Sequence, residues 1–177
     1  MLYKTIDNFL PTDQADIIEE VFLGYHPNWQ YNQTVADNND TSGVYFSCNF
    51  ISELGSSLIV SPKCIRGIGY IFDSLEKHNL LNEYDIVRAR ANLYTQTDKI
   101  IEHAYHRDDK RNHVSVIYSI NTNNGYTRVI IDDKIIKIES IKNRILIIDG
   151  QLKHASSTCT DEKVRVNLNF NFFSKWL

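Results

Sequence analysis

The stretch "VRVNLNFNFF", residues 164–173, alternates apolar and polar side chains from Val164 to Phe172. Successive side chains of a β-strand point to opposite faces, so Arg165, Asn167, Asn169 and Asn171 would share one face, opposite the Val, Leu and Phe side chains. A polar face in a core strand needs a reason, because an arginine buried without a partner is costly. This strand therefore predicts a sheet with one hydrophobic face and one face that lines a polar cavity.

The stretch "YDIVRARANLYT", residues 84–95, divides in the same way. Its apolar side chains share one face, and its polar side chains share the other: Arg88, Arg90, Asn92 and Tyr94. Tyrosine is common in strands and its hydroxyl often reaches only the backbone, so Asn92 and Tyr94 alone are weak indicators of a site. Arg88 and Arg90 either contact an anionic substrate group, line the open rim, or form solvent-exposed salt bridges.

Short strands separated by turn-forming residues are expected throughout the second half of the chain. Four more are predicted at residues 114–121, 126–131, 134–138 and 144–149, divided by turns such as "NTNNG". Strands this short and this closely spaced form antiparallel sheets, and two packed sheets or a barrel would bury them. The sequence therefore predicts a mainly β fold.

Two helices are expected in the first half of the chain, where they would cover one outer face of the sheets. Thr12 can cap the first helix after Pro11, and Gly24 would end it. Its apolar face would contain Ala15, Ile17, Ile18, Val21 and Phe22. Ser61, followed by Pro62, would begin the second helix. Its apolar positions are Ile65, Ile68, Phe72 and Leu75.

Residues 24–43, which are rich in Asn, Asp and aromatic residues, are expected to form a long loop with a short strand inside it. The loop contains His26, Trp29 and Tyr31. These side chains would either form a lid over a site or pack against the body of the protein.

The length of 177 residues is enough for one domain with a substantial core. We expect a single domain over residues 1–177, with helical support in residues 1–83 and a β core in residues 84–173. Hydrophobic residues make up 42% and charged residues 23%, which is typical of a folded soluble protein rather than a disordered or membrane chain. The net charge of -3 gives no general attraction to nucleic acid.

The N-terminus lacks the features of a signal peptide, and the apolar runs are too short to span a bilayer. We therefore expect a cytoplasmic location and no membrane partner. Cys48, Cys64 and Cys159 are odd in number, widely separated and without C-x-x-C spacing, so reduced and mostly buried thiols are expected.

The polar run "HAYHRDDKRN", residues 103–112, precedes an apolar strand. In an extended segment residues two apart point to the same side, so His106 and Asp108 could direct an imidazole and a carboxylate at one point. His154, which follows the strand at residues 144–149, is the candidate for a third ligand. Two histidines and one carboxylate on one face of a metal ion are the arrangement associated with non-haem Fe(II).

A lone His-x-Asp pattern is weak and is more often a solvated turn. Its combination with a distal histidine and with Arg165, whose planar fork of donors suits a carboxylate, is more specific. His103 and His113 would instead suggest a zinc site with His106. We expect both to lie at the surface, since a three-histidine site leaves Asp108 and Arg165 unexplained.

The order of these motifs resembles that of the 2-oxoglutarate- and Fe(II)-dependent oxygenases, in particular the small phage-type and prolyl 4-hydroxylase-like members. The matching elements are N-x-Y, H-x-D, a strand that ends in Asn, G-x-T, a distal His and R-x-N-x-N, over roughly residues 84–173. "IDNFLPTDQADII" is a looser match to the family's usual first helix. "NNGYTRV" departs from the family pattern because Asn124 stands where a second glycine is common, which affects only the turn.

The resemblance implies a double-stranded β-helix, which is a cupin-like jelly roll, with flanking N-terminal helices. It implies that His106, Asp108 and His154 bind iron. It also implies that Arg165 holds the distal carboxylate of 2-oxoglutarate. The catalytic set would then be these four residues.

Further residues match positions that help to hold the co-substrate in AlkB-type relatives: Asn92, Tyr94 and Asn167. The cofactors implied are Fe(II), 2-oxoglutarate as co-substrate and O2, with ascorbate as an additional reductant. The activity implied is that of a dioxygenase that hydroxylates a C–H bond and releases succinate and CO2.

The substrate expected first is a prolyl or other residue in a protein or peptide, followed by a free amino acid or small metabolite. AlkB-like nucleobase demethylation is a third alternative, suggested by "NLY" and "RVNLNF", but the acidic balance and the lack of a basic stripe argue against a nucleic-acid partner. A non-catalytic jelly-roll binding module is the alternative from another class. Such a module has no need for an intact ligand set together with a carboxylate-holding arginine.

Overall fold

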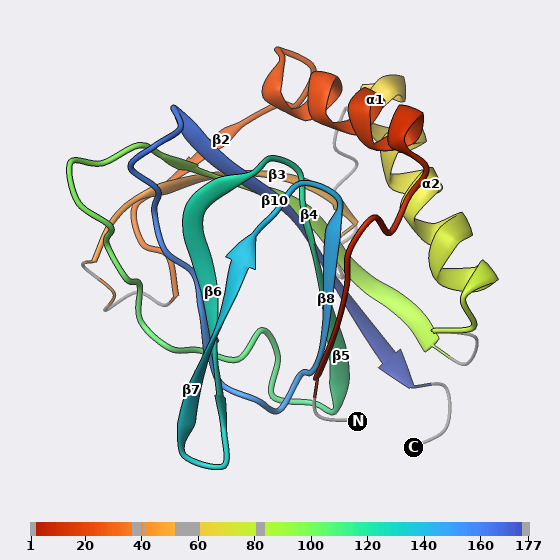
Figure 1. Cartoon of the computed structure of the whole chain (residues 1–177). Coiled ribbons are helices and arrows are strands. Elements are labelled where there is room, and N and C mark those ends of the chain that lie inside the picture. The colour runs from red at the N-terminus through yellow and green to blue at the C-terminus, as the bar shows by residue number, and fades with distance from the viewer. Residues whose placement is uncertain (1–2, 37–39, 41, 52–60, 81–83, 175–177) are drawn as a thin grey trace.

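Two antiparallel β-sheets and two helices make up the computed structural model (Figure 1), which describes residues 3–36, 40, 42–51, 61–80 and 84–174. The large sheet has the spatial order β1 (Tyr3–Ile6), β8 (Arg144–Asp149), β5 (His113–Ser119), β10 (Val164–Ser174), β4 (Tyr84–Thr95), β3 (Tyr45–Ile51) and β2 (Gln30–Asn32). The small sheet has the order β7 (Lys134–Ser140), β6 (Asn123–Ile131) and β9 (His154–Ala155). The pairings between these strands are antiparallel, as predicted.

The helices α1 (Thr12–Leu23) and α2 (Pro62–Lys77) cover one face of the large sheet (Figure 1). The predicted capping role of Thr12 is wrong, because Pro11 is the N-cap residue and Thr12 is already helical. Ser61 is the N-cap of α2 and Pro62 follows it, as predicted, although the Ser61 side chain makes no cap hydrogen bond.

Two isoleucines predicted on the apolar helix faces are exposed instead: Ile17 at 39% and Ile65 at 58%. Each is the direct sequence neighbour of a fully buried residue, Ile18 or Cys64. Adjacent residues of a helix point in clearly different directions. Because the buried face of each helix includes Ile18 or Cys64, the neighbouring isoleucine lies at the edge that faces solvent.

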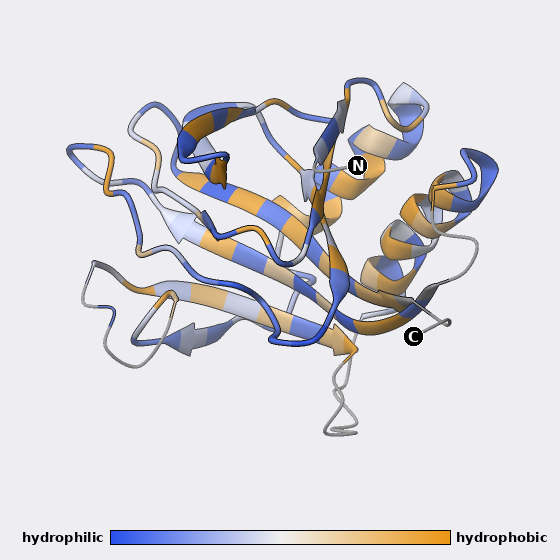
Figure 2. Cartoon of the chain, turned by 90° about the horizontal axis from the view of Figure 1, so that it is seen from below, coloured by the Kyte–Doolittle hydropathy of each residue, from blue (hydrophilic) through white to orange (hydrophobic). Residues whose placement is uncertain are grey.

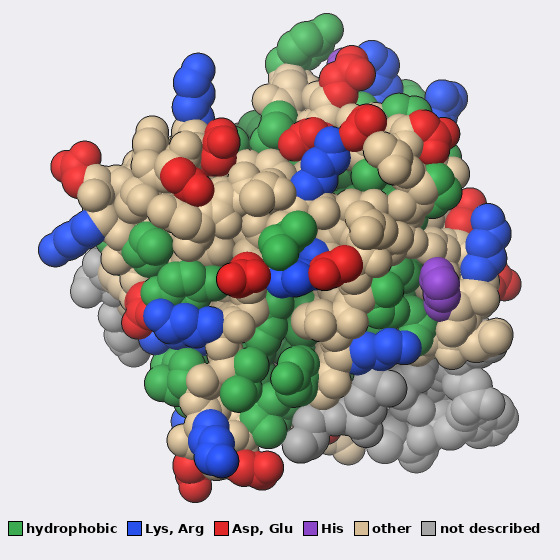
Figure 3. Space-filling view, viewed as in Figure 1, with side chains coloured by type: hydrophobic (Ala, Val, Ile, Leu, Met, Phe, Trp, Pro, Cys, Tyr) green, Lys and Arg blue, Asp and Glu red, His purple; other side chains and the backbone are tan. Residues whose placement is uncertain are grey.

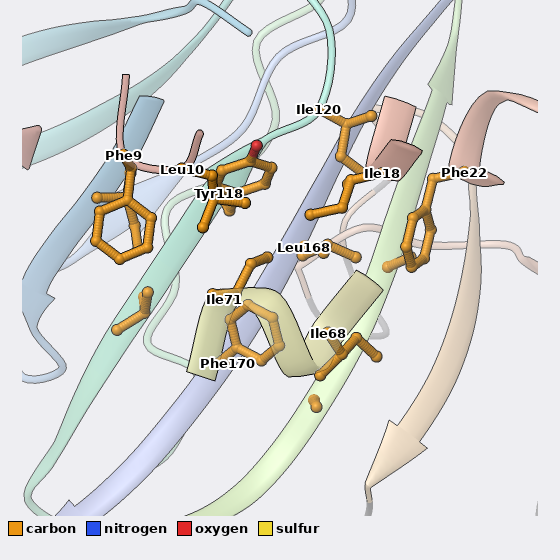
Figure 4. Close-up of a cluster of buried hydrophobic side chains, with 14 of the residues drawn as sticks. Phe9, Leu10, Ile18, Phe22, Ile68, Ile71, Tyr118, Ile120, Leu168 and Phe170 are labelled. Atoms are coloured by element: carbon orange, nitrogen blue, oxygen red, sulfur yellow. The ribbon is translucent and has the colours of Figure 1, made fainter. Parts of the chain in front are cut away.

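The main hydrophobic core lies between the helices and the large sheet (Figure 4). Phe22 from α1 and Ile71 from α2 belong to the same cluster as Leu168 and Phe170 of β10, and all four side chains are fully buried. Burial of each such side chain contributes about 1.5–3 kcal/mol to folding. This packing fixes β10, which is the central strand of the large sheet.

The strand β10 sends hydrophobic and polar side chains alternately to the two faces of the sheet, an alternation visible along the long strands in Figure 2. Its polar residues are no more than 5% exposed: Arg165, Asn167, Asn169 and Asn171. They lie opposite the polar residues of β4, since Asn167 pairs with Asn92 and Asn169 pairs with Arg90. The predicted division of both strands is therefore confirmed.

The small sheet covers the polar face of the large sheet. A second hydrophobic cluster joins the two sheets, with Ile117 and Leu146 from the large sheet and Val129 and Ile138 from the small one. Polar side chains fill the interior beside this cluster, and Arg165 contacts residues of both β6 and β7 there. The interior between the sheets is thus partly hydrophobic and partly a polar chamber.

The strands predicted beyond residue 84 are present within a few residues of their expected bounds. The segment predicted as helical support also contributes the strands β1, β2 and β3 to the large sheet. The strand β2 is the short strand expected inside the loop at residues 24–43. β1 and β2 are too short to give a periodic signal, and the burial of β3 does not alternate.

The cysteines Cys48, Cys64 and Cys159 are buried and free, as predicted. Burial raises the pKa of the Cys64 thiol to about 11. Within the described residues, neither helix combines the length and the apolar character needed to cross a membrane.

Candidate functional site

Backbone pairing between two segments brings His106 and His154 side by side. The His106 amide donates to the His154 carbonyl oxygen at 2.9 Å, and the His154 amide donates to the His106 carbonyl oxygen at 3.0 Å. His154 is held from its other side by β6, where it pairs with Val129. As a result, the centroids of the two imidazole rings lie 4.8 Å apart.

The carboxylate of Asp108 completes a cluster with these two histidines. Nε2 of His106 lies 3.8 Å from Oδ1 of Asp108, and Nε2 of His154 lies 3.6 Å from Oδ2. All of the candidate ligand atoms lie within 4.8 Å of one another. Protein ligands lie about 2.0–2.2 Å from a divalent transition-metal ion, so this spacing leaves room for one ion. The structure therefore brings together the residues predicted as metal ligands.

Both imidazoles are oriented by backbone carbonyl groups. Nδ1 of His106 lies 3.3 Å from the carbonyl oxygen of Ala104, and Nδ1 of His154 lies 3.4 Å from that of Leu152. A proton on each Nδ1 would donate to these oxygens, which leaves the lone pair of each Nε2 on the side of Asp108. Metal-binding histidines are commonly oriented in this way.

The side chain of Asp108 is 1% exposed and held by polar groups from two neighbouring strands. Its Oδ2 accepts hydrogen bonds from Oγ of Ser115 at 3.0 Å and from Nδ2 of Asn171 at 3.0 Å, with Asn169 at 3.4 Å. Its Oδ1 lies 2.5 Å from Nη2 of Arg88, an ion pair that fixes the second carboxylate oxygen.

The protonation states of the cluster suit a metal ion. Burial alone would raise the pKa of Asp108, but His154, Arg88 and Arg90 and the hydrogen bond from Asn171 hold it well below the usual value. Burial, together with the neighbouring imidazole, lowers the pKa of His106. At neutral pH the cluster therefore holds an ionised carboxylate and a neutral His106, the forms that bind metals.

The guanidinium of Arg165 is buried in the interior between the sheets. It donates from Nε to Oγ of Ser140 at 2.8 Å, from Nη1 to the Ser157 carbonyl oxygen at 3.1 Å, and from Nη2 to Oγ1 of Thr127 at 3.1 Å. The ring of Tyr94 lies 5.4 Å from its central carbon. All of these partners are neutral, and no acidic side chain among the described residues forms an ion pair with Arg165.

A second buried arginine shows the more usual arrangement. Arg128 is 8% exposed, and its Nη1 lies 2.8 Å from Oε2 of Glu102. Its charge is therefore paired within the chain, whereas the 2% exposed Arg165 has no such partner in the described part of the protein. Because an unpaired buried charge is costly, Arg165 is the better candidate for contact with an anionic ligand.

A narrow space of about 20 Å³ lies between the ligand cluster and the surroundings of Arg165. Its lining includes His106 and His154, and also Tyr94 and Thr127, which both contact Arg165. This volume is enough for about one water molecule. Binding of a larger ligand therefore requires the lining side chains to move apart.

Three further residues predicted to hold a co-substrate line the same inner space: Asn92, Tyr94 and Asn167. Nδ2 of Asn92 donates to Oδ1 of Asn167 at 3.1 Å, while Oδ1 of Asn92 is buried without a hydrogen-bond partner. Burial raises the pKa of Tyr94, so its hydroxyl remains protonated and able to donate. The predicted set is thus assembled around one interior space.

The predicted surface positions of His103 and His113 are wrong, since the two are 1% and 5% exposed. Nδ1 of His103 pairs with Oγ of Ser156 at 2.8 Å, and its ring stacks on Tyr94 with centroids 5.2 Å apart. Nδ1 of His113 lies 2.8 Å from the Arg111 carbonyl oxygen. Nε2 of each ring is buried without a hydrogen-bond partner, and neither histidine joins His106 in the metal-type cluster found among the described residues.

A larger pocket of about 640 Å³ opens outside the ligand cluster. Its lining includes His106, Asp108 and the arginines Arg88, Arg90 and Arg107. Of the alternatives open for Arg88 and Arg90, a position on this pocket is the one the structure supports.

The loop at residues 24–43 contributes to this pocket through Tyr31 and its successors. Trp29 packs against the main hydrophobic core instead, and His26 lies beside Lys63, with Nε2 and Nζ 3.3 Å apart. Of the aromatic side chains considered for a lid, only Tyr31 therefore reaches the pocket. Residues 37–39 and 41 of this loop lie outside the described residues.

Another cavity, of about 610 Å³, lies between β1 and the small sheet. Figure 3 shows hydrophobic side chains gathered on this face of the molecule. Tyr3, Ile136 and Ile138 contribute to the lining, together with charged groups such as Lys137. None of the buried unpaired polar atoms of the described residues belongs to its lining, so it gives no sign of a built site.

The sequence prediction missed the residues that hold Asp108 and Arg165 in place. Ser115 contacts Asp108, and Ser140 and Ser157 contact Arg165. The alternation of "VSVIYS" already placed Ser115 and Ser119 on one strand face, which is a signal for a polar interior side. Ser157 contacts Arg165 through its backbone, which residue type cannot reveal.

No protein-family model matches this sequence, and no curated protein sequence is similar enough to count as a match. Solved structures do match. The chain is similar to a prolyl hydroxylase from Trichoplax adhaerens, in complex with a peptide fragment of the hypoxia inducible factor oxygen degradation domain, at 18% identity and a TM-score of 0.65, covering 98% of this chain and 84% of that one.

Two further structures extend this comparison. An oxidoreductase of the 2OG-Fe(II) oxygenase family from Burkholderia pseudomallei matches at 14% identity and a TM-score of 0.66, covering 93% of this chain and 78% of that one. HygX from Streptomyces hygroscopicus, with nickel and 2-oxoglutarate bound, matches at 8% identity and a TM-score of 0.63, covering 99% and 84%. At these identities the likeness establishes the fold, which confirms the predicted double-stranded β-helix with flanking N-terminal helices.

Proposed function

We propose that this chain is an Fe(II)- and 2-oxoglutarate-dependent dioxygenase that hydroxylates a C–H bond. The observation that carries the proposal is the combination of a His-Asp-His cluster with a buried arginine that has no acidic partner among the described residues. One interior space is lined by the two histidines of the cluster and by Tyr94 and Thr127, which contact that arginine. His106, Asp108 and His154 would hold the metal ion. Arg165 would hold the far carboxylate of a dicarboxylic co-substrate, for which its planar fork of donors is suited.

When bound, Fe(II) together with 2-oxoglutarate and O2 supplies the oxidising chemistry, which converts 2-oxoglutarate into succinate and CO2 and adds a hydroxyl group to the substrate. Ascorbate would serve only as an additional reductant. The chain's own contribution is position, charge and exclusion of water.

The residues of the interior would divide these tasks. His106 and Asp108 also line the outer pocket, from which substrate and O2 would reach a metal ion held by the cluster. Asp108 is kept ionised by its surroundings, so it balances part of the charge of a bound cation. Tyr94 covers the guanidinium of Arg165 and keeps its charge away from water. Asn92 and Asn167 would orient the co-substrate beside it.

The substrate proposed first is a prolyl or other residue of a protein or peptide, with a small metabolite as the alternative. The peptide bound by the Trichoplax enzyme supports this by analogy of fold. We also propose that residues 1–177 act as one oxygenase domain in the cytoplasm.

The proposal is tested by assaying succinate release and by measuring 2-oxoglutarate binding calorimetrically in the presence of Mn(II). Arg165→Lys should weaken 2-oxoglutarate binding about tenfold or more, because a lysine cannot form the two parallel hydrogen bonds of a guanidinium. The matched change Arg128→Lys should leave it close to wild type, since Arg128 pairs with Glu102. Tight binding without succinate formation on peptide and metabolite panels would instead support a non-catalytic binding module.

A further inference from the structure

We propose that the outer pocket binds an anionic group of the substrate, a carboxylate or a phosphate, and that Arg90 and Arg107 hold it. The proposal rests on the proposed function, because it concerns the substrate of the same site. If the proposal is correct, the substrate is a peptide or metabolite that carries an anionic oxygen group next to the carbon that is oxidised.

The charge of the pocket is the first reason. Arg88, Arg90 and Arg107 contribute to its lining, and Asp108 is the acidic residue among its lining residues. The whole chain has a net charge of -3, so this concentration of positive charge is local. A volume of about 640 Å³ also lies in the range of about 300–1,000 Å³ that is typical of small-ligand sites.

The unsatisfied state of Arg90 is the second reason. Its Nε is buried without a hydrogen-bond partner, and its Nη1 makes one long hydrogen bond of 3.3 Å to the Tyr45 hydroxyl. No acidic side chain among the described residues forms an ion pair with it. A guanidinium remains charged throughout the physiological pH range, so its free donors favour an anion.

The position of Arg90 is the third reason. It lines the outer pocket and also the inner space, which Tyr94 and Thr127, both contacts of Arg165, line as well. An anion bound to Arg90 would therefore lie next to His106, which lines both spaces as well. This would fix the attached carbon chain beside the ligand cluster, as a substrate-positioning contact must do.

The other two arginines have different partners. Arg88 is already engaged, with Nη2 2.5 Å from Asp108 and Nε donating to Oδ1 of Asn171 at 2.6 Å, so it positions the carboxylate ligand. Arg107 is exposed, and within the described residues its side chain donates to a backbone group, the Gln151 carbonyl oxygen at 2.7 Å. Its charge is thus available at the rim of the pocket.

The test uses the full chain loaded with Zn(II), which is diamagnetic, and saturated with 2-oxoglutarate. Arginine Nε–H signals are followed by ¹H–¹⁵N NMR during separate titrations with acetate and inorganic phosphate, and Arg90 is assigned from the signal missing in Arg90→Gln. The Arg90 signal should shift saturably with at least one anion. The affinity for that anion should fall about tenfold in Arg90→Gln, the loss expected for a charge-assisted hydrogen bond. Saturation by acetate or by phosphate identifies which group the substrate carries.

Arg66→Gln is the matched control, because it removes one positive charge from the exposed surface of α2 and should bind the anions like wild type. Equal anion affinities in the wild type, Arg90→Gln and Arg66→Gln would overturn the proposal. So would an Arg90→Gln variant that loses 2-oxoglutarate affinity instead, since Arg90 would then serve the co-substrate. Repeating the titration on metal-free protein keeps a failure of the anion site distinct from a failure to bind metal or 2-oxoglutarate.

Discussion

Gly125 leaves the space through which the side chain of Arg165 passes. A β-carbon at position 125 would lie 2.6 Å from Cδ of Arg165 and 2.7 Å from the carbonyl oxygen of Thr158. The second of these atoms belongs to the backbone and cannot rotate away. Of the two glycines common in the family motif, the chain keeps the one at position 125, which Arg165 requires. The replacement of the other by Asn124 is therefore tolerated.

Gly125→Ala is expected to destabilise the protein by about 1–3 kcal/mol, the usual range for overpacking, and to weaken 2-oxoglutarate binding through displacement of Arg165. Gly69→Ala is the matched control, since a β-carbon there meets nothing within 4 Å. It lies in α2 and should stabilise the protein by up to about 1 kcal/mol. Urea denaturation measures both changes. Equal stabilities for the two variants would contradict the close contact between positions 125 and 165.

Asp108→Ala is expected to abolish metal-dependent turnover of 2-oxoglutarate, because it removes the one carboxylate of the cluster and leaves the charge of Arg88 unpaired. Asp109→Ala is the control at the adjacent position. Asp109 pairs with Arg111 at 2.6 Å, away from the cluster, and its loss should leave turnover near wild type. Succinate release measures both variants, and normal turnover by Asp108→Ala would refute its role as a ligand.

Ser115→Ala is expected to weaken metal binding by about 10–100-fold, because it removes a hydrogen bond that orients the ligand carboxylate. Ser119→Ala removes a hydroxyl from the same face of β5 without touching Asp108 and should bind metal like wild type. Competition against a chromophoric chelator gives both affinities. If the two variants bind metal equally well, the hydrogen bond from Ser115 has no part in orienting Asp108.

The stability of the protein should fall as the pH falls from about 6.5 to about 4, in part through His103. Burial lowers the pKa of His103 from 6.5 to about 4, so in this window the unfolded chain takes up a proton that the folded chain excludes. The contribution is fully present above pH 6.5 and is lost progressively below it, by at most about 3 kcal/mol. Denaturation of His103→Gln at several pH values should show a shallower dependence. An unchanged slope would show that His103 does not titrate in this way.

The fold was predictable from the sequence where side-chain alternation was long and regular. In β4 and β10 the alternation predicted the polar and apolar faces correctly. It therefore also predicted that Arg165, Asn92 and Tyr94 point inward. The edge strand β1 was not predicted, and β2 was expected only as a short strand without bounds, because three or four residues carry too little periodicity. They are strands only because a neighbouring strand offers them hydrogen bonds.

The candidate site was predictable as a set of residue types but not as a set of contacts. The backbone bridge that pairs His106 with His154 depends on tertiary structure, which a local sequence pattern cannot predict. The buried positions of His103 and His113 were mispredicted for a related reason. Their surface positions were predicted by excluding a three-histidine site, which says nothing about packing. In the structure the ring of His103 stacks on Tyr94 and that of His113 lies beside Phe173.

A crystal structure of the protein soaked with Mn(II) and an inert mimic of 2-oxoglutarate tests the central claim most directly. We expect one anomalous scattering peak within bonding distance of Nε2 of His106, Nε2 of His154 and a carboxylate oxygen of Asp108. The far carboxylate of the mimic should lie against the guanidinium of Arg165. A metal bound elsewhere, or a mimic that leaves Arg165 without an anionic partner, would contradict the account.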